Sequence, residues 1–281
     1  MSRLRVFVLV VLTMIAFAGN SLLCRVALKA TRIDAATFTT ARIVSGALAL
    51  WLIVRLRDGV HPVAGSWRSA LALFAYAAAF SLAYVSLPAG TGALLLFGAV
   101  QATMIGYGLW RGERMRPRQV LGLASASAGL VVLTLPGISA PPLQGTLLML
   151  GAGIAWGIYS LRGRSGGDPL RATAGNFLRA VPFATALSIA AAQWLSLDYA
   201  GIAYAVASGA LTSGVGYAIW YTVLPGLRAT HAATVQLSVP VIAAVGGIAF
   251  LGEQMTLRLL IAAAAILGGI ALVVVVRPQP R

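Results

Sequence analysis

The most chemically versatile side chains of this sequence are polar and aromatic residues inside long apolar segments. Asparagine, glutamine and serine donate and accept hydrogen bonds, and tryptophan and tyrosine carry flat rings with one polar atom. Such residues are informative there, because lipid offers them no partner. The candidates for lining a binding cavity are Asn20, Ser21, Gln101, Trp156, Tyr159, Tyr217, Trp220 and Gln236. For each of them, a packing role between helices is an equally good interpretation.

Two arginines also lie inside apolar segments. Arg42 and Arg179 stand roughly 10–12 Å along their predicted helices, at 1.5 Å per residue. A guanidinium presents its N–H donors in a plane that suits a carboxylate, so both are candidates for binding a substrate by its charge. The alternative, which the sequence alone favours, is that both snorkel towards the membrane surface and cap neighbouring carbonyl groups.

Acidic residues are few, and none lies in the middle of an apolar segment. All six fall at or near predicted segment ends: Asp34, Asp58, Glu113, Asp168, Asp198 and Glu253. Proton-coupled membrane carriers usually keep a carboxylate or a histidine at mid-depth, and these six residues do not provide a carboxylate there. The single cysteine, Cys24, excludes an internal disulfide and a cysteine metal site. No cofactor and no metal are expected.

The composition places these side chains in a membrane. Of the 281 residues, 59% are hydrophobic and 10% are charged, against about 25% charged residues in soluble domains. No residue ionised at pH 7 lies between Arg68 and Arg111 or between Arg118 and Arg162, and each interval can hold two spans of about 20 residues. The net charge of +15 does not indicate nucleic acid, because the basic residues punctuate apolar runs.

Turn signals such as Leu-Pro-Ala-Gly at 87–90 and Leu-Pro-Gly at 224–226 divide the chain into ten predicted transmembrane helices. Their expected ranges are 6–24, 35–55, 67–86, 89–110, 117–135, 144–162, 171–194, 199–221, 230–251 and 257–276. With the N-terminus in the cytoplasm, most of the 21 lysines and arginines fall in cytoplasmic loops. We therefore expect a multi-pass protein of a bacterial-type inner membrane with both termini in the cytoplasm.

The chain is expected to consist of two related halves, residues 1–137 and 138–281. Gly-Glu-x-Met occurs at 112–115 and 252–255, Tyr-x-x-Leu-Pro occurs at 84–88 and 221–225, and Arg42 matches Arg179. Each half holds five predicted helices, an odd number, so the second half must cross the membrane in the opposite sense. Inverted repeats are a transporter architecture that holds the substrate near mid-membrane at the repeat interface. We expect Glu113 and Glu253 to bond the start of the helix that follows each of them.

Several motifs resemble those of the drug/metabolite transporter superfamily, specifically its EamA-type members with ten helices. They are Phe-Ala-Gly-Asn at 17–20, Ala-Trp-Gly-Ile-Tyr at 155–159, the two arginines, the segment 214–228 and the Gly-Glu-x-Met corners. The first helix departs from the usual pattern at Ala18-Gly19 and at Arg25. Within the superfamily the chain is most similar to the YddG-like amino-acid exporters. This resemblance implies an exporter of small organic metabolites, amino acids first, that works by alternating access around a central cavity.

The ninth predicted helix has the features of a moving element. Pro240 lacks the N–H that would bond the carbonyl of Gln236, so we expect a kink there. Gly246 and Gly247 loosen the same helix further along. Helix breaks at membrane depth are tolerated where they face protein or a watery cavity. Pro240, Gly246 and Gly247 are therefore candidate hinge residues.

Other functions stay open beside transport of amino acids. Exporters of other metabolites or drugs would share the fold, and Gly153-x-x-x-Gly157 would also suit a membrane scaffold. An intramembrane enzyme is disfavoured, because Ser165-Gly-Gly-Asp168 lacks a partner aspartate and no phosphate-binding glycine motif occurs. We predict a protein that is not an enzyme, with a small-molecule substrate and membrane lipids as partners. Its oligomeric state is left open.

Overall fold

The computed structural model describes residues 2–59, 64–135, 137, 140–163, 167–227 and 229–275. Every regular element within these ranges is a helix. The first half contains α1 (Arg3–Ala30), α2 (Ala35–Asp58), α3 (Trp67–Tyr84), α4 (Ala89–Trp110) and α5 (Pro117–Thr134). The second half begins with α6 (Leu143–Arg162), α7 (Pro169–Ala190) and η1 (Ala192–Trp194). It continues with α8 (Tyr199–Val206), η2 (Ala207–Val215), α9 (Gly216–Val223), η3 (Leu224–Gly226), α10 (Ala229–Gln236), α11 (Ser238–Leu251) and α12 (Leu257–Val275).

Six helical segments of the described ranges are long and apolar enough to cross a membrane. They are α1, α2, α4, the segments Tyr199–Gly226 and Thr234–Leu251, and Leu257–Val274 within α12. The expected all-α membrane architecture is therefore confirmed. The count of ten spans stays a prediction, because length and composition single out only these six.

Acidic residues begin several helices by capping free main-chain N–H groups. Asp34 Oδ1 accepts hydrogen bonds from the N–H groups two and three residues further on, at 3.0 and 2.9 Å, and Asp168 and Asp198 cap α7 and α8 in the same manner. Burial favours the neutral form of Asp34, but hydrogen bonds from Thr37 and Ser196 outweigh it and lower the pKa of this carboxyl. These caps explain why the acidic residues gather at helix ends.

The two Gly-Glu-x-Met corners share a backbone conformation that glycine adopts without strain. Gly112 has a φ of 87° and Gly252 a φ of 63°, in the left-handed region that disfavours other residues. The prediction for Glu253, however, is wrong. Its Oε2 accepts a hydrogen bond at 2.8 Å from the N–H of Ala89, at the start of α4 and not of α12. The turn at Gly252 brings the carboxylate back over Gly247, where the missing side chain leaves it room.

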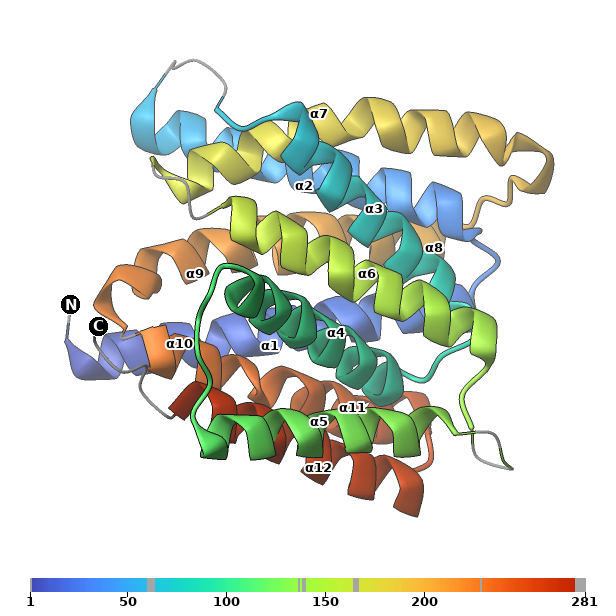
Figure 1. Cartoon of the computed structure of the whole chain (residues 1–281). Helices are drawn as coiled ribbons and strands as arrows, with labels where there is room; N and C mark the ends of the chain where they lie inside the picture. The colour runs from blue at the N-terminus through green and yellow to red at the C-terminus, as the bar shows by residue number, and fades with distance from the viewer. Residues whose placement is uncertain are drawn as a thin grey trace.

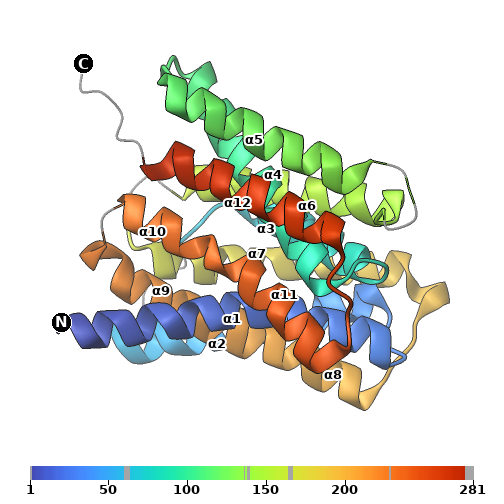
Figure 2. The same cartoon turned by 90° about the horizontal axis from the view of Figure 1, so that it is seen from below.

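Helices from the two halves of the sequence pack against each other (Figures 1 and 2). α2 contacts α7, α4 contacts α11, and α5 contacts α12, while α3 and α4 both contact α6. The main chains of α5 and α12 lie close together at Gly122 and Gly269, where a side chain on either residue would clash with the carbonyl oxygen of the other. The start of α1 and the end of α12 lie at the same end of the bundle.

The predicted ninth helix is interrupted. α10 ends at Gln236 and α11 begins at Ser238, so the break falls where Pro240 cannot bond the Gln236 carbonyl. α11 then continues through Gly246 and Gly247 without a second break. Both glycines lie at close contacts, Gly246 against Leu22 of α1 and Gly247 against the Glu253 carboxylate.

Candidate substrate-binding site

Polar and aromatic side chains from five elements of the bundle meet in its interior. α1, α2 and α3 contribute one residue each from the first half, and α6 and α9 contribute the rest from the second half. We call this group the central cluster; its members are Asn20, Arg42, Tyr76, Trp156, Tyr159 and Tyr217. The sequence predicted five of these six residues as site candidates, and Tyr76 is the addition.

The Tyr76 hydroxyl is the centre of a buried hydrogen-bond network. Asn20 Nδ2 donates to it at 3.2 Å and Arg42 Nη2 donates to it at 3.0 Å. On its other side, Asn20 Oδ1 accepts from the hydroxyl of Ser208 at 2.7 Å and from that of Thr212 at 3.4 Å. These partners fix the orientation of the Asn20 amide and connect α1, α2 and α3 of the first half to η2 of the second.

Ser208 and Thr212 belong to an unusual element. η2 is a π-helix, in which each hydrogen bond spans one residue more than in an α-helix. π-helical segments are rare, and they are frequently found at functional sites. The sequence did not predict this segment, although its run of small and hydroxyl residues at 207–214 permits close approach of α2. At Gly209, for instance, a side chain would clash with the carbonyl oxygen of Arg42.

Aromatic rings form one wall of the central cluster. The Trp156 ring lies 4.8 Å from the ring of Tyr76, 5.2 Å from that of Tyr159 and 5.8 Å from that of Tyr217, centroid to centroid. The last two contacts are stacked, with interplanar angles of 29° and 18°. Trp156 is only partly buried, unlike the three tyrosines. Flat, mostly apolar rings with polar edges can contact a small organic solute by stacking and by hydrogen bonds.

Arg42 lies against the Tyr76 ring of this group and is 3% exposed. Its guanidinium carbon is 5.3 Å from the centroid of the Tyr76 ring and 4.8 Å from that of the Phe80 ring, both within the range of cation–π attraction. Nη2 bonds Tyr76, but Nη1 has no hydrogen-bond partner in the described part of the chain. The positive charge is therefore held by ring faces and one hydroxyl.

Arg179 has a different environment from Arg42. Its Nη1 donates to the carbonyl oxygens of Ala64 and Gly175, at 2.6 and 3.1 Å. Next to it, Asn176 Oδ1 accepts from the N–H of Ser66 at 2.9 Å. Both side chains therefore fasten the chain just before α3 to α7. For Arg179 this is the carbonyl capping that the sequence favoured, whereas no carbonyl of the described residues bonds Nη1 of Arg42.

The remaining predicted site residues lie outside the central cluster. Ser21 is buried beside the hydroxyl of Tyr84. Trp220 packs edge-on against Phe17 and belongs to a separate apolar cluster. Gln236 is partly buried at the end of α10.

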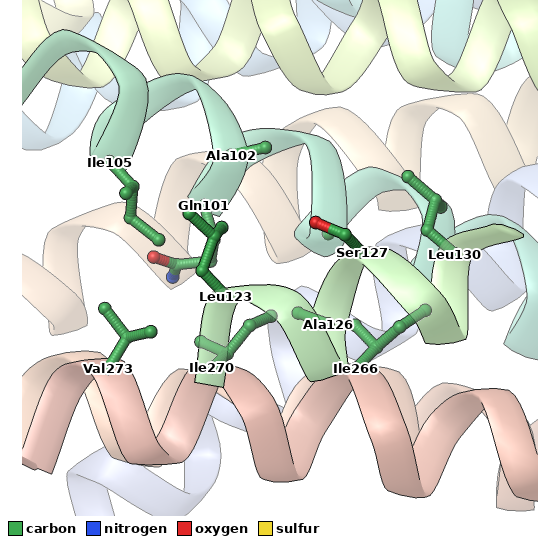
Figure 3. Close-up of a pocket in the computed structure, with 11 residues that line it drawn as sticks. Gln101, Ala102, Ile105, Leu123, Ala126, Ser127, Leu130, Ile266, Ile270 and Val273 are labelled. Atoms are coloured by element: carbon green, nitrogen blue, oxygen red, sulfur yellow. The ribbon is translucent and has the colours of Figure 1, made fainter. Parts of the chain in front are cut away.

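Gln101 lines a small cavity between α4, α5 and α12 (Figure 3). The cavity has a volume of about 40 Å³, and Ile105, Leu123 and Val273 are among its apolar lining residues. Ser127 is a further polar group there. This volume accommodates a water molecule but not an organic metabolite.

A second polar contact set closes one end of the bundle. Arg25 pairs with Glu253, Nε to Oε1 at 3.3 Å, with side chains only 11% and 8% exposed. Arg25 Nη1 also donates to the carbonyl oxygens of Tyr84 and Val85, at 2.8 and 3.0 Å. One ion pair thus joins α1, the α3–α4 turn and the α11–α12 turn. The described ion pairs at the opposite end are those of Arg57 with Asp58 and Asp168.

The outer surface of the helices is apolar while hydrogen-bonding groups gather inside. Exposed large side chains include Leu48, Leu121, Ile189 and Ile261. This distribution suits lipid, which cannot satisfy polar groups. With six segments able to cross a bilayer, the fold and its buried polar centre define an integral membrane transporter.

Comparison with known proteins gives the family. The model of the EamA-like transporter family matches residues 143–275, and the chain belongs to this family, within the drug/metabolite transporter superfamily. Its relatives of known activity are transporters and not enzymes. Uncharacterized protein PA1977 of Pseudomonas aeruginosa is 59% identical over 97% of this chain and 96% of its own.

Two further matches add detail. The threonine/homoserine exporter RhtA of Escherichia coli is 34% identical over 160 residues, which are 54% of this chain and 53% of the exporter. A protein of known crystal structure aligns with 97% of this chain and 98% of its own, with a TM-score of 0.65 and 18% identity. At this low identity, the match to the crystal structure shows only that the two folds are similar.

Proposed function

We propose that this protein exports small organic metabolites across a bacterial-type inner membrane, with amino acids as the first candidates. The observation that carries this function is the central cluster, where both halves of the chain offer hydrogen bonds, flat rings and a buried positive charge to one small solute. The similarity to threonine/homoserine exporters, over little more than half of each chain, supports amino acids as the substrate class.

The proposed architecture is ten spans in two inverted halves, 1–137 and 138–281, with both termini in the cytoplasm. Equivalent helices of the two halves contact each other, α2 with α7, α4 with α11 and α5 with α12, as expected around a pseudo-two-fold axis. The contact of Gly122 with Gly269 also has a counterpart, because Gly129 meets the carbonyl of Ala262. The two Gly-Glu-x-Met sequences are 140 positions apart. The same shift converts the first of these contacts into the second, because Gly122 corresponds to Ala262 and Gly269 to Gly129.

Alternating access requires parts that move. The break between α10 and α11 lies next to Pro240, and we propose it as a hinge, with Gly246 and Gly247 as sliding contacts against α1 and the Glu253 corner. The buried pair of Arg25 and Glu253 holds that end of the bundle closed. Opening this end would require the pair to separate.

Export is proposed to run down the substrate gradient. The described acidic residues lie at helix ends, where Asp34, Asp168 and Asp198 cap helices and Glu253 pairs with Arg25. Within the described ranges, the central cluster contains no carboxylate or histidine that could relay a proton.

Counterflow in proteoliposomes tests this function. Sealed liposomes that contain the purified protein are loaded with one unlabelled amino acid, and uptake of the same labelled amino acid is measured across a panel that begins with threonine and homoserine. The wild-type protein is expected to accumulate label for at least one amino acid and to return it chemically unaltered.

Matched variants connect this transport to the central cluster. Asn20→Ala and Trp156→Ala are expected to lower uptake by about tenfold or more, because each loses contacts in the cluster. Gln101→Ala, a polar truncation in the separate cavity, and Gln236→Ala are expected to retain most of it. Absence of uptake by the wild type for every amino acid would contradict the assignment, and uptake of other metabolites or drugs would redirect it.

A further inference from the structure

Arg42 is the most deeply buried charged residue in the described ranges. An arginine stays protonated in a protein interior, so its charge cannot be removed by loss of a proton. A buried cation ordinarily acquires an anionic partner and fills all its hydrogen bonds, since each unmet donor destabilises the protein. Arg42 instead leaves Nη1 without an acceptor in the described part of the chain.

The chain does not provide the missing anion from its described carboxylates. Glu253 is paired with Arg25, and Asp58 and Asp168 are paired with Arg57. Asp34 and Asp198 accept from main-chain N–H groups at helix starts. Glu113 lies exposed at the corner that follows α4.

Neighbouring neutral groups do not complete the shell of Arg42 either. The Tyr76 hydroxyl already receives two donors, from Asn20 and from Nη2 of Arg42. Asn20 Oδ1 accepts from Ser208 and Thr212. The amide is therefore turned so that its oxygen faces η2 and its N–H group faces Tyr76.

We propose that Nη1 of Arg42 binds the carboxylate of the transported substrate, while the rings around Trp156 contact the rest of the molecule. This inference rests on the proposed function and specifies the substrate as an organic monocarboxylate. A single buried guanidinium balances one negative charge, whereas a phosphate dianion would require a second cation, and the described cluster has none. Trp156, which is partly buried, packs against the Tyr76 ring whose hydroxyl bonds Arg42.

The repeat strengthens this assignment. Arg179 has the equivalent position in the second half, and it bonds the carbonyls of Ala64 and Gly175. An arginine at this position therefore bonds main-chain carbonyl groups when they are within reach, as Arg179 does. At Arg42 no carbonyl of the described residues bonds Nη1, so this donor is available for a ligand.

The test compares two solutes that differ only in the carboxylate. L-threonine and threoninol, in which a CH₂OH group replaces the carboxylate, compete for uptake of a labelled amino acid by proteoliposomes. Wild-type protein is expected to prefer threonine by about tenfold or more, because only threonine supplies a charge-assisted acceptor to Arg42. Arg42→Gln is expected to abolish this preference and Arg42→Lys to restore part of it.

Thermal unfolding of the same preparations checks that the variants are folded. Arg42→Gln removes an incompletely bonded charge and is expected to unfold no earlier than the wild type. Equal competition by threonine and threoninol in the wild type, or a preference that survives in Arg42→Gln, would overturn the carboxylate site. The proposed transport function would still stand. If the wild type moves no amino acid at all, the proposed function fails instead, and the carboxylate site fails with it.

Discussion

Arg42 and Arg179 occupy equivalent positions in the two halves of the sequence, but their surroundings differ. Arg179 is tied to the carbonyls of Ala64 and Gly175 and fastens the chain before α3 to α7. Arg42 shares the Tyr76 hydroxyl with Asn20 and keeps Nη1 unbonded in the described protein. Matching arginines thus have different contacts, because Arg179 is bonded to main-chain carbonyls whereas Arg42 keeps a buried donor unbonded.

The glutamates of the repeated corners differ in the same way. Glu253 is nearly buried, pairs with Arg25 and accepts from the N–H of Ala89. Glu113 is exposed. The α5–α12 contact, in contrast, is similar from both sides, because a glycine of each helix packs against a carbonyl oxygen of the other. The halves therefore share their helix packing and differ in their polar contacts.

The largest loss of stability is expected at the α5–α12 contact, where the two halves are alike. Gly269→Leu places a side chain against the carbonyl oxygen of Gly122 and is expected to lower the free energy of unfolding by more than about 3 kcal/mol, because neither main chain can yield. Gly268→Leu is the control, since a side chain at that position would point into open space, away from any neighbouring helix. Unfolding in detergent measures both. Equal stability of the two variants would refute the close crossing.

The next effect separates the two corners. Glu253→Ala is expected to cost about 3 kcal/mol, the lower end for breaking a buried ion pair, since Arg25 loses its anionic partner but keeps its bonds to two carbonyl oxygens. Glu113→Ala, at an exposed position, is expected to change stability by less than about 0.5 kcal/mol. Similar losses from both substitutions would show that the corners are equivalent after all.

The two arginines should differ in stability as well as in binding. Arg179→Gln is expected to cost about 2 kcal/mol, because it removes charge-assisted hydrogen bonds from two carbonyl groups. Arg42→Gln is expected to leave stability unchanged or to raise it. Thermal unfolding of the two purified variants side by side checks this difference, and a larger loss for Arg42→Gln would reverse the roles of the two arginines.

The smallest effect concerns a cap that both halves share. Asp34→Ala is expected to cost about 1 kcal/mol at pH 7 by removing the cap of α2. The folded protein lowers the pKa of Asp34, so the charge-dependent part of this contribution is complete above the unfolded pKa of about 3.9 and is lost as pH falls through the lower, folded value. The stability gap between wild type and Asp34→Asn, measured from pH 7 downwards, should therefore narrow only in acid. A gap that stays constant with pH would contradict the shift.

Helix positions were largely predictable because local signals determine them. The predicted starts at 35, 89 and 117 coincide with the first residues of α2, α4 and α5, where an aspartate cap or a proline marks the boundary. The break near Pro240 follows from the same backbone chemistry. The π-helix η2 has no such local signal in its sequence, and it lies where α2 packs closely against Gly209.

The site was predictable only in part, since residue type reveals polarity but not direction. Asn20, Arg42 and Trp156 converge in the structure, whereas Gln101 faces a separate cavity. Tyr76 was overlooked. An all-apolar helix environment leaves no amphipathic pattern to show which face of each span points inwards.

Side-specific thiol labelling tests the inverted halves most directly. Arg114→Cys and Gln254→Cys introduce thiols at the equivalent, exposed third positions of the two Gly-Glu-x-Met corners, in a Cys24→Ser background. With a membrane-impermeant maleimide on intact cells, the thiol at 254 is expected to react, whereas the thiol at 114 should react only after the cytoplasmic face is exposed. Reaction of both thiols from the same compartment would contradict the inverted architecture, and with it the meeting of opposed halves around one substrate.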